Sequence, residues 1–391
     1  MRKIDIIQYG GNILFVLLLF CFAADPTNAI FHAKDIAFLL LIAYNLIFLQ
    51  AKWDKIIYFV MGEVAILIPY LIAVARGEYI DHDFAFVLVK SMAPLCLLPW
   101  IHHYDVLKLS QWPTVITACI VIILFWTIFF LPETELFIYE FMRSKDNTIM
   151  MANRSFLGKE IFCMNHKATA SFLIILAVFF YRSITKDKLS WLSILGCCIL
   201  INVFLITGSR MTMLFPFFTI GLILFHFYRD KRYYNYFIYP FLAIVGLCFS
   251  FLLYVLASEI NEPSNLVKYA HLESYKTLFS ENPLYLLFGQ GPGARYYSMG
   301  FHRMTVQTEW TYIELVRYMG IFSFLIFFIF FYPLYHLYKK RTESDLAIVI
   351  FYAFAVYLLI AGTNPLLLSS TGMFSLSVVY SFLAKDEQTR V

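Results

Sequence analysis

The sequence predicts an all-α polytopic membrane protein with about twelve transmembrane helices and two larger loops on one side of the membrane. Of its 391 residues, 61% are hydrophobic and only 14% are charged, and the mean hydropathy is +0.72. A soluble domain carries about 25% charged residues. Apolar runs of about 17–25 residues recur along the whole chain, each long enough to cross the hydrocarbon core as a helix. A transmembrane β-barrel would show short alternating segments instead.

The spans can be bounded to within a few residues. The first begins close to Met1 and has no small-residue cleavage site, and further spans follow it. We therefore expect a retained helix and not a removed signal peptide. The predicted spans are 6–24, 36–51, 56–75, 84–101, 112–131, 167–182, 189–207, 211–228, 234–257, 311–337, 345–362 and 369–384.

The distribution of Lys and Arg among the short loops predicts that both termini face the cytoplasm. One set of helix ends holds most of these residues, as cytoplasmic ends do. The short loops at the opposite ends hold only four: Lys34, Arg76, Lys90 and Arg210. Two long segments, 132–167 and 258–310, then face outward, and we treat residues 1–391 as one integral membrane domain that carries these two loops.

The two outward loops are unusually basic. A basic surface on the outer side of a largely membrane-embedded protein indicates an anionic ligand. The ten basic residues in or beside these loops are Arg143, Lys145, Arg154, Lys159, Lys167, Lys268, Lys276, Arg295, Arg303 and Arg317.

The seven cysteines predict neither a disulfide framework nor a metal site. Six fall within predicted spans, and only Cys163 lies in an outer loop. The odd count and the lack of CxxC or Cys/His spacing argue against both kinds of site. We expect no metal and no cofactor.

The second outer loop is predicted to contain an interfacial helix. Leu266, Tyr269, Leu272, Tyr275 and Phe279 recur at three- and four-residue spacing, which is typical of an amphipathic helix lying along the membrane surface. A Gly/Pro turn, GQGPG, follows at 289–293. A helix then leads into the tenth span.

Two acidic residues near the start of that helix are the catalytic candidates. Glu309 or Glu314 could accept a proton from a sugar hydroxyl at the membrane surface. The alternative is an interfacial acid favoured by the helix dipole. Glu314 is also three residues from Arg317, which places the two on one helix face, where they can simply pair.

The arginines are candidates for anion binding. Arg210 lies in ITGSRMTML, between the seventh and eighth predicted spans. A guanidinium there could clamp a phosphate or could instead extend to the interface. Arg154, Arg295 and Arg303 are further candidates, with solvated loop charge as the alternative.

The order of these motifs resembles the superfamily of O-antigen ligases and O-antigen polymerases. The resemblance covers roughly residues 150–325. It rests on a TGSR turn, an LFGxGxG turn, an acid-led helix that ends at a glycine, and an arginine, glycine and asparagine in the first loop. These are Thr207–Arg210, Leu287–Gly293, Glu309–Glu314 with Gly320, and Arg154, Gly158 and Asn165.

The resemblance implies a metal-independent glycosyltransferase of GT-C-like architecture. It implies a bacterial inner-membrane enzyme with its active site on the periplasmic face and an undecaprenyl-pyrophosphate-linked oligosaccharide as donor. Membrane lipids and a chain-length regulator are the implied partners, and nucleic acid is not. Glu309 would activate the acceptor, with Glu314 as a second candidate. Residues implied to contact substrate or pyrophosphate are Arg210, Arg154, Arg295, Arg303, Lys268, His271, Asn165 and His166.

Departures from the family pattern favour a polymerase of O-antigen or capsule repeat units. Ligases have a His-Asn-like pair where this chain has Glu309-Trp310, and His302 is out of register. An arginine expected early in the second loop is replaced by a residue near Lys268 or His271. Loss of Arg210 is expected to cost far more activity than loss of Arg76.

Two alternatives remain open at the level of sequence. A ligase would join finished polymer to lipid A–core. A flippase of lipid-linked oligosaccharide would be expected to carry charges within its spans and to show two similar halves. The sequence does not determine the sugars, the linkage, its stereochemistry, the kind of surface glycan or the oligomeric state.

Overall fold

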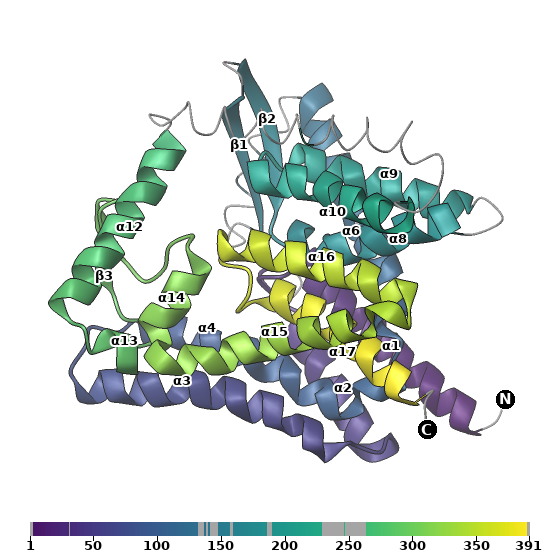
Figure 1. The fold of residues 1–391 in the computed structure, drawn as a ribbon, viewed down its shortest axis with the longest axis horizontal. Helices are drawn as coiled ribbons and strands as arrows, with labels where there is room; N and C mark the ends of the chain where they lie inside the picture. Colours follow the sequence, from purple (N-terminus) through teal and green to yellow (C-terminus); the bar gives the residue numbers. More distant parts are fainter. Residues whose placement is uncertain are drawn as a thin grey trace.

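The structure is a computed structural model that describes residues 3–30, 32–131, 137, 140, 148–156, 159–185, 190–228, 246 and 263–388. Most of the longer helices run in roughly one direction. Both termini lie at one end of the bundle, and α12, α13 and β3 lie at the other (Figure 1). The α-helices are α1 (Lys3–Ala24), α2 (Lys34–Phe48), α3 (Ile57–Ala75), α4 (His82–Met92), α5 (Val106–Leu109), α6 (Gln111–Phe130), α8 (Leu173–Thr185), α9 (Trp191–Ile206), α10 (Arg210–Tyr228), α12 (Pro263–Glu281), α13 (Tyr285–Phe288), α14 (Thr311–Met319), α15 (Ser323–Lys339), α16 (Asp345–Gly362) and α17 (Ser370–Gln388).

The structure supports a multi-pass α-helical membrane protein. Within the described residues, seven helical segments are long and apolar enough to cross a membrane: Ile6–Ala24, Trp53–Ala75, His82–His103, Val106–Phe130, Arg210–Tyr228, Thr311–Thr342 and Asp345–Gly362. The shorter apolar segments Thr169–Thr185 and Trp191–Ile206 coincide with the sixth and seventh predicted spans. Helices α2 and α17 coincide with the second and the last. The predicted ninth span, 234–257, lies outside the described residues except for residue 246.

The core of the bundle is built around α8. Its residues Leu173–Val178 are all buried, as expected of a helix that is apolar on every side. Helices α9, α10 and α16 pack around it (Figure 1). Leu71, Phe130 and Phe324 lie on the outside of the bundle and are largely exposed, which is the arrangement that lipid contact requires.

The first outer loop contains a β-hairpin, to which the sequence analysis had assigned no regular structure. Strands β1 (Ile149–Phe156) and β2 (Lys159–His166) pair antiparallel, with Ile149 opposite His166. Ile149 and Met164 are buried against Val121 and Ile128 of α6. The hairpin is therefore attached to the bundle by apolar contacts that a reading of helical periodicity does not detect.

The second outer loop contains the predicted helix, α12 (Pro263–Glu281). Leu266 and Tyr269 of α12 are exposed, whereas His271, Ser274 and Tyr275 are buried. The polar face is covered because it packs on strand β3 (Tyr296–Ser298), which pairs antiparallel with β4 (Arg303–Thr305). Ser274 Oγ, for example, accepts from the Met299 amide at 2.8 Å.

The glycine turn and the end of α14 pack backbone against backbone. Gly289 has φ +72°, and a Cβ placed there would lie 2.2 Å from the Tyr318 carbonyl oxygen. Gly320 has φ +54°, and its Cβ would lie 2.4 Å from the Leu287 carbonyl oxygen. Because both positions need a left-handed backbone and the absence of a side chain, the turn and the helix end can be joined only with glycine at each.

Candidate functional site

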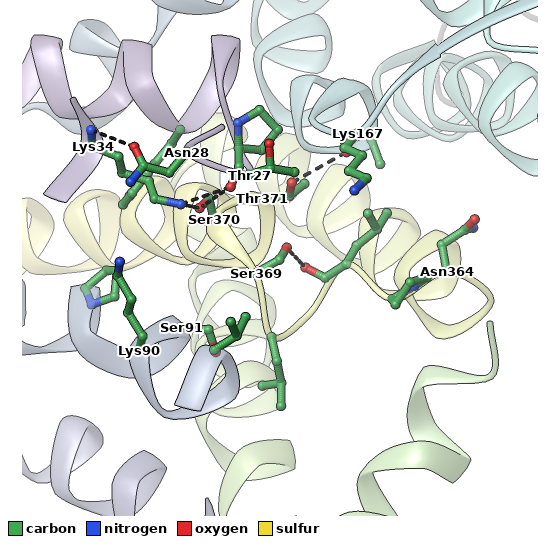
Figure 2. A pocket seen from close by; sticks show the side chains of 18 of the residues that line it. Thr27, Asn28, Lys34, Lys90, Ser91, Lys167, Asn364, Ser369, Ser370 and Thr371 are labelled. Carbon is green, nitrogen blue, oxygen red and sulfur yellow. Dashed lines mark hydrogen bonds between the residues drawn. The ribbon is translucent and has the colours of Figure 1, made fainter. Parts of the chain in front are cut away.

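A pocket of about 870 Å3 lies at the end of the bundle that carries the two outer loops. Its walls come from segments far apart in the sequence: the α1–α2 connection, α2, α4, the end of β2, the start of α10, residue 307 and the α16–α17 connection (Figure 2). The residues that line it include Asn28, Lys34, Asp35, Phe38, Leu39, Phe86, Val87, Lys90, Asn165, His166, Lys167, Thr212, Gln307, Asn364, Ser369 and Ser370.

Three lysines, Lys34, Lys90 and Lys167, line this pocket. Asp35 pairs with Lys90 and also acts electrostatically on Lys34. Lys34 Nζ donates to the Pro26 carbonyl at 3.0 Å and to Ser370 Oγ at 2.9 Å. Lys90 Nζ lies 2.5 Å from Asp35 Oδ2. Burial lowers the pKa of the Lys34 ammonium, because the charged form loses water that two neutral oxygens only partly replace. Lys167 is the third.

One wall of the pocket is apolar and exposed to the surroundings of the bundle. Leu39 on α2 and Phe86 and Val87 on α4 are 63%, 66% and 58% exposed, although they line the pocket. Large apolar side chains at the rim of a pocket in a membrane protein face lipid at low cost. The pocket therefore has lysines and amides among its lining residues and an apolar edge.

Two predicted site residues, Asn165 and His166, line the pocket. His166 is almost fully buried at the end of β2, and burial lowers its pKa to about 4. The ring is thus neutral at physiological pH. Its Nε2 lies 3.4 Å from the Ala24 carbonyl and its Nδ1 accepts from the Ala168 amide at 3.3 Å. We infer that Nε2 carries the proton. His166 joins the hairpin to the end of α1.

Two of the predicted arginines are close in sequence to lining residues. Arg210 is the first residue of α10 and is half-buried, and Thr212 lines the pocket two residues later. Arg154 lies in β1 opposite Ile161, but its side chain is outside the described part of the structure. The anion-binding role of both residues stays a prediction.

The basic residues predicted in the second loop do not line the pocket. Arg295 forms an ion pair with Asp81 at 2.8 Å and covers the Tyr79 ring, so it ties this loop to the α3–α4 connection. Arg303 is exposed above the Phe301 ring.

His271 is also placed away from the pocket. It is buried in α12 with Nδ1 2.8 Å from Ser298 Oγ, and burial lowers its pKa. In the described structure His271 holds α12 against β3, a packing role.

Glu314 is buried and fully engaged by donors. Its Oε1 accepts from the Tyr275 hydroxyl at 2.7 Å, the Tyr296 hydroxyl at 3.2 Å and the Thr308 amide at 2.7 Å. Its Oε2 accepts from Arg317 Nε at 2.7 Å. Burial raises the pKa of both tyrosines, so they remain neutral donors. A carboxylate with four donors is an anchor for the second outer loop, and a catalytic role of Glu314 stays a prediction.

Glu309 is the accessible member of the predicted acidic pair. Its side chain is 48% exposed and lies 3.3 Å from Lys268 Nζ. It follows the pocket residue Gln307 by two positions. An exposed pair of this kind contributes about 0–1 kcal/mol, so the carboxylate can exchange partners.

Arg76 is not an inert reference residue. Its Nη2 donates to the Gly289 carbonyl at 2.5 Å, and its guanidinium stacks on the Tyr285 ring at 5.2 Å. The comparison of Arg210 with Arg76 stays a prediction, but substitution of Arg76 would disturb the glycine turn.

Sequence reasoning missed Lys34, Asp35, Lys90 and the α16–α17 connection as pocket residues. A signal was present, because Lys34 and Lys90 are two of the four basic residues in short outward loops, where such residues are avoided. The connection, with Asn364 and Ser369, carried no charge and gave no signal.

No protein-family model, curated protein or solved structure matches this chain. The fold and the pocket by themselves define a multi-pass α-helical membrane protein with a lysine-containing, partly apolar pocket at one end of its bundle.

Proposed function

We propose that this protein is a polymerase of O-antigen or capsule repeat units. It would transfer a growing glycan from undecaprenyl pyrophosphate to an incoming lipid-linked repeat unit on the periplasmic face of the bacterial inner membrane. The observation that carries the proposal is the pocket, which combines three lysines, neutral amides and hydroxyls, and an apolar wall exposed at the side of the bundle.

These three kinds of surface suit the three parts of a lipid-linked sugar. An isoprenoid chain needs the apolar wall of Leu39, Phe86 and Val87, and a diphosphate needs cations. Sugar hydroxyls need amides such as Asn165 and Asn364. The volume of about 870 Å3 is within the range of small-ligand pockets. It suits a headgroup with its first sugars, while the rest of the glycan extends outward.

The proposed reaction needs a base and a stabilised leaving group. The acceptor hydroxyl gives its proton to a carboxylate, its oxygen bonds to the anomeric carbon, and the bond from that carbon to the diphosphate oxygen breaks. Glu309 is the proposed base because its carboxylate is accessible and close in sequence to Gln307. Lysine ammonium groups would stabilise the negative charge that develops on the departing lipid diphosphate.

The twelve-span topology with cytoplasmic termini belongs to this proposal. Its support is that both termini lie at one end of the bundle and the described parts of the second loop lie at the other (Figure 1). The same topology places Glu309, His166 and the pocket lysines on the outer side.

The test is the length of the surface polysaccharide in cells that lack this protein, resolved as a gel ladder. Collapse to a single repeat unit on lipid A–core, restored by the wild-type chain, is the expected result. Long polymer stalled on the lipid carrier would instead identify a ligase. Repeat units trapped on the cytoplasmic face would identify a flippase.

A variant pair then tests the proposed base. Glu309→Gln at matched abundance is expected to leave single repeats, while Glu281→Gln, an exposed carboxylate at the end of α12, is expected to keep the full ladder. Equal ladders for the two variants would remove Glu309 from the mechanism.

A further inference from the structure

We propose that Lys34 and Lys90 form the diphosphate subsite of the pocket. In the absence of ligand Asp35 pairs with Lys90, and a lipid diphosphate displaces the Asp35 carboxylate when it binds. The identity of the lipid rests on the proposed function. The position of the anion rests on the described side chains alone.

Lys34 is held in place without a carboxylate bound to its amine. Its described partners are two neutral oxygens, those of Pro26 and Ser370. An ammonium has three N–H donors, so one remains for a ligand inside the pocket. The neighbouring Asp35 carboxylate is turned to Lys90 and to Asn28 Nδ2, at 2.5 Å and 3.0 Å. Desolvation lowers the pKa of the half-buried Lys34 amine, and an incoming anion would favour its charged form again.

Lys90 and Asp35 join the two helices that frame the apolar wall. Lys90 is in the last turn of α4 and Asp35 is in the first turn of α2. Their side chains are 46% and 41% exposed, and an exposed pair contributes little stability. A diphosphate carries more negative charge than one carboxylate, and Lys34 and Lys90 both line the pocket that would hold it. We therefore expect a diphosphate to displace Asp35 from Lys90.

The apolar wall lies next to these cations on the helix surface. Phe38 and Leu39 follow Lys34 and Asp35 by one turn on α2, and Phe86 precedes Lys90 by one turn on α4. Side chains four residues apart share a helix face. A lipid whose diphosphate contacts the two lysines can therefore lay its first isoprene units on this wall.

The opposite side of the pocket is left for sugars. Figure 2 shows Lys34 and Lys90 on one side and Asn364 across from them. Gln307 and Asn165 also line the pocket, and both belong to the outer segments. The proposed direction of the bound substrate is therefore lipid toward α2 and α4 and glycan toward the side of Asn364 and Lys167.

The experiment measures binding of farnesyl diphosphate to the purified full chain in nanodiscs of neutral lipid. Farnesol and inorganic pyrophosphate are the comparison probes. Farnesyl diphosphate is expected to bind more tightly than either, since only it satisfies both the lysines and the wall. Inorganic pyrophosphate binding as tightly would mean a site for a free anion and would overturn the lipid assignment.

Four variants assign the subsite. Lys34→Met and Lys90→Met are each expected to weaken binding of farnesyl diphosphate by about tenfold or more, the loss of one charge-assisted hydrogen bond. Lys108→Met is the control, because that lysine is exposed and does not line the pocket. Asp35→Asn is expected to tighten binding. If Lys34→Met unfolds, Lys34→Gln, which keeps an N–H for Pro26 and Ser370, replaces it.

The outcomes separate this inference from the proposed function. Lysine variants that bind like Lys108→Met, or weaker binding by Asp35→Asn, would overturn the subsite even if deletion of the protein collapses the polysaccharide ladder. Binding that follows Lys34 and Lys90 in a protein whose deletion leaves the ladder unchanged would refute the polymerase and keep the lipid diphosphate site.

Discussion

Replacing Arg317 by methionine is expected to destabilise the protein by about 3–5 kcal/mol, the cost of removing one partner of a buried ion pair. Arg317 is fully buried in α14 and lies 2.7 Å from Glu314 Oε2. Its guanidinium also donates to Gln290 Oε1 at 2.7 Å, the Ala294 carbonyl at 2.9 Å and the Val306 carbonyl at 2.5 Å. Methionine can meet none of these acceptors, and the Glu314 charge would be left without its cation.

Arg317→Met should lower the free energy of unfolding and should also loosen the second outer loop, because Arg317 connects α14 to three points of that loop. Equilibrium unfolding of the detergent-solubilised chain measures the free energy, and limited proteolysis across 282–310 measures the loosening. The surface ladder should shorten too, since the Val306 carbonyl precedes the pocket residue Gln307.

Two companion variants sharpen this test. Lys276→Met removes an exposed pair with Glu273 in the same loop and should cost no more than about 1 kcal/mol. Arg317→Lys keeps the charge but loses the planar fork of five donors, so it should remain clearly destabilised. A loss for Arg317→Met as small as that for Lys276→Met, with unchanged proteolysis, would refute the anchor role of this pair.

Three further outcomes are expected. Gly289→Ala should prevent stable packing of the turn on α14. Gly77→Ala is the control, because Gly77 has a nearly equal φ of +73° but nothing lies within 4 Å of the added Cβ, and it should lower the thermal stability much less. Equal thermal stability of the two variants would contradict the close approach of the turn to α14. Lys268→Met breaks the Lys268–Glu309 pair and should change the free energy of unfolding by less than about 1 kcal/mol. A loss of activity in Glu309→Gln would then reflect a catalytic role of the carboxylate and not a loss of stability. The pKa of His166 is about 4 in the folded protein and about 6.5 when exposed, so its contribution to the free energy of unfolding should be fully present above about pH 6.5 and fall by about 3 kcal/mol as the pH is lowered to about 4. Acid unfolding of the His166→Gln variant should show a flatter dependence on pH. An unchanged slope would contradict the neutral, buried state of His166.

The basic residues that line the pocket are not those of the second long loop. The long loops contain many basic residues, but Arg295 forms an ion pair with Asp81 and Arg317 forms one with Glu314. Lys34 and Lys90, from short connections, face the cavity instead. A charge count alone does not separate cations that hold a loop together from cations available to a ligand.

The helical parts of the fold were predictable from the sequence because hydropathy and backbone geometry are local properties. An apolar run of sufficient length must satisfy its own backbone hydrogen bonds in a membrane, which requires a helix. The turn at 289–293 was predictable for a similar reason, since glycine tolerates positive φ. The hairpin 149–166 was not foreseen, because its strands are held by contacts with α6 rather than by their own pattern.

The sequence by itself therefore determined the class of protein and the position of most helices. Only the tertiary structure decided which polar side chains meet. Lys34, Lys90, Asn165 and Asn364 are separated by tens to hundreds of residues, and they line one pocket because helix packing and the hairpin bring their segments together. Glu314 and Glu309 look alike in the sequence, but burial with four donors makes the first an anchor, and exposure beside Lys268 leaves the second accessible. The three-residue spacing of Glu314 and Arg317 indicated that these two could pair, and the structure confirms the pair. The burial of Glu314 and its other donors are properties of the packed chain, and no local pattern gave them.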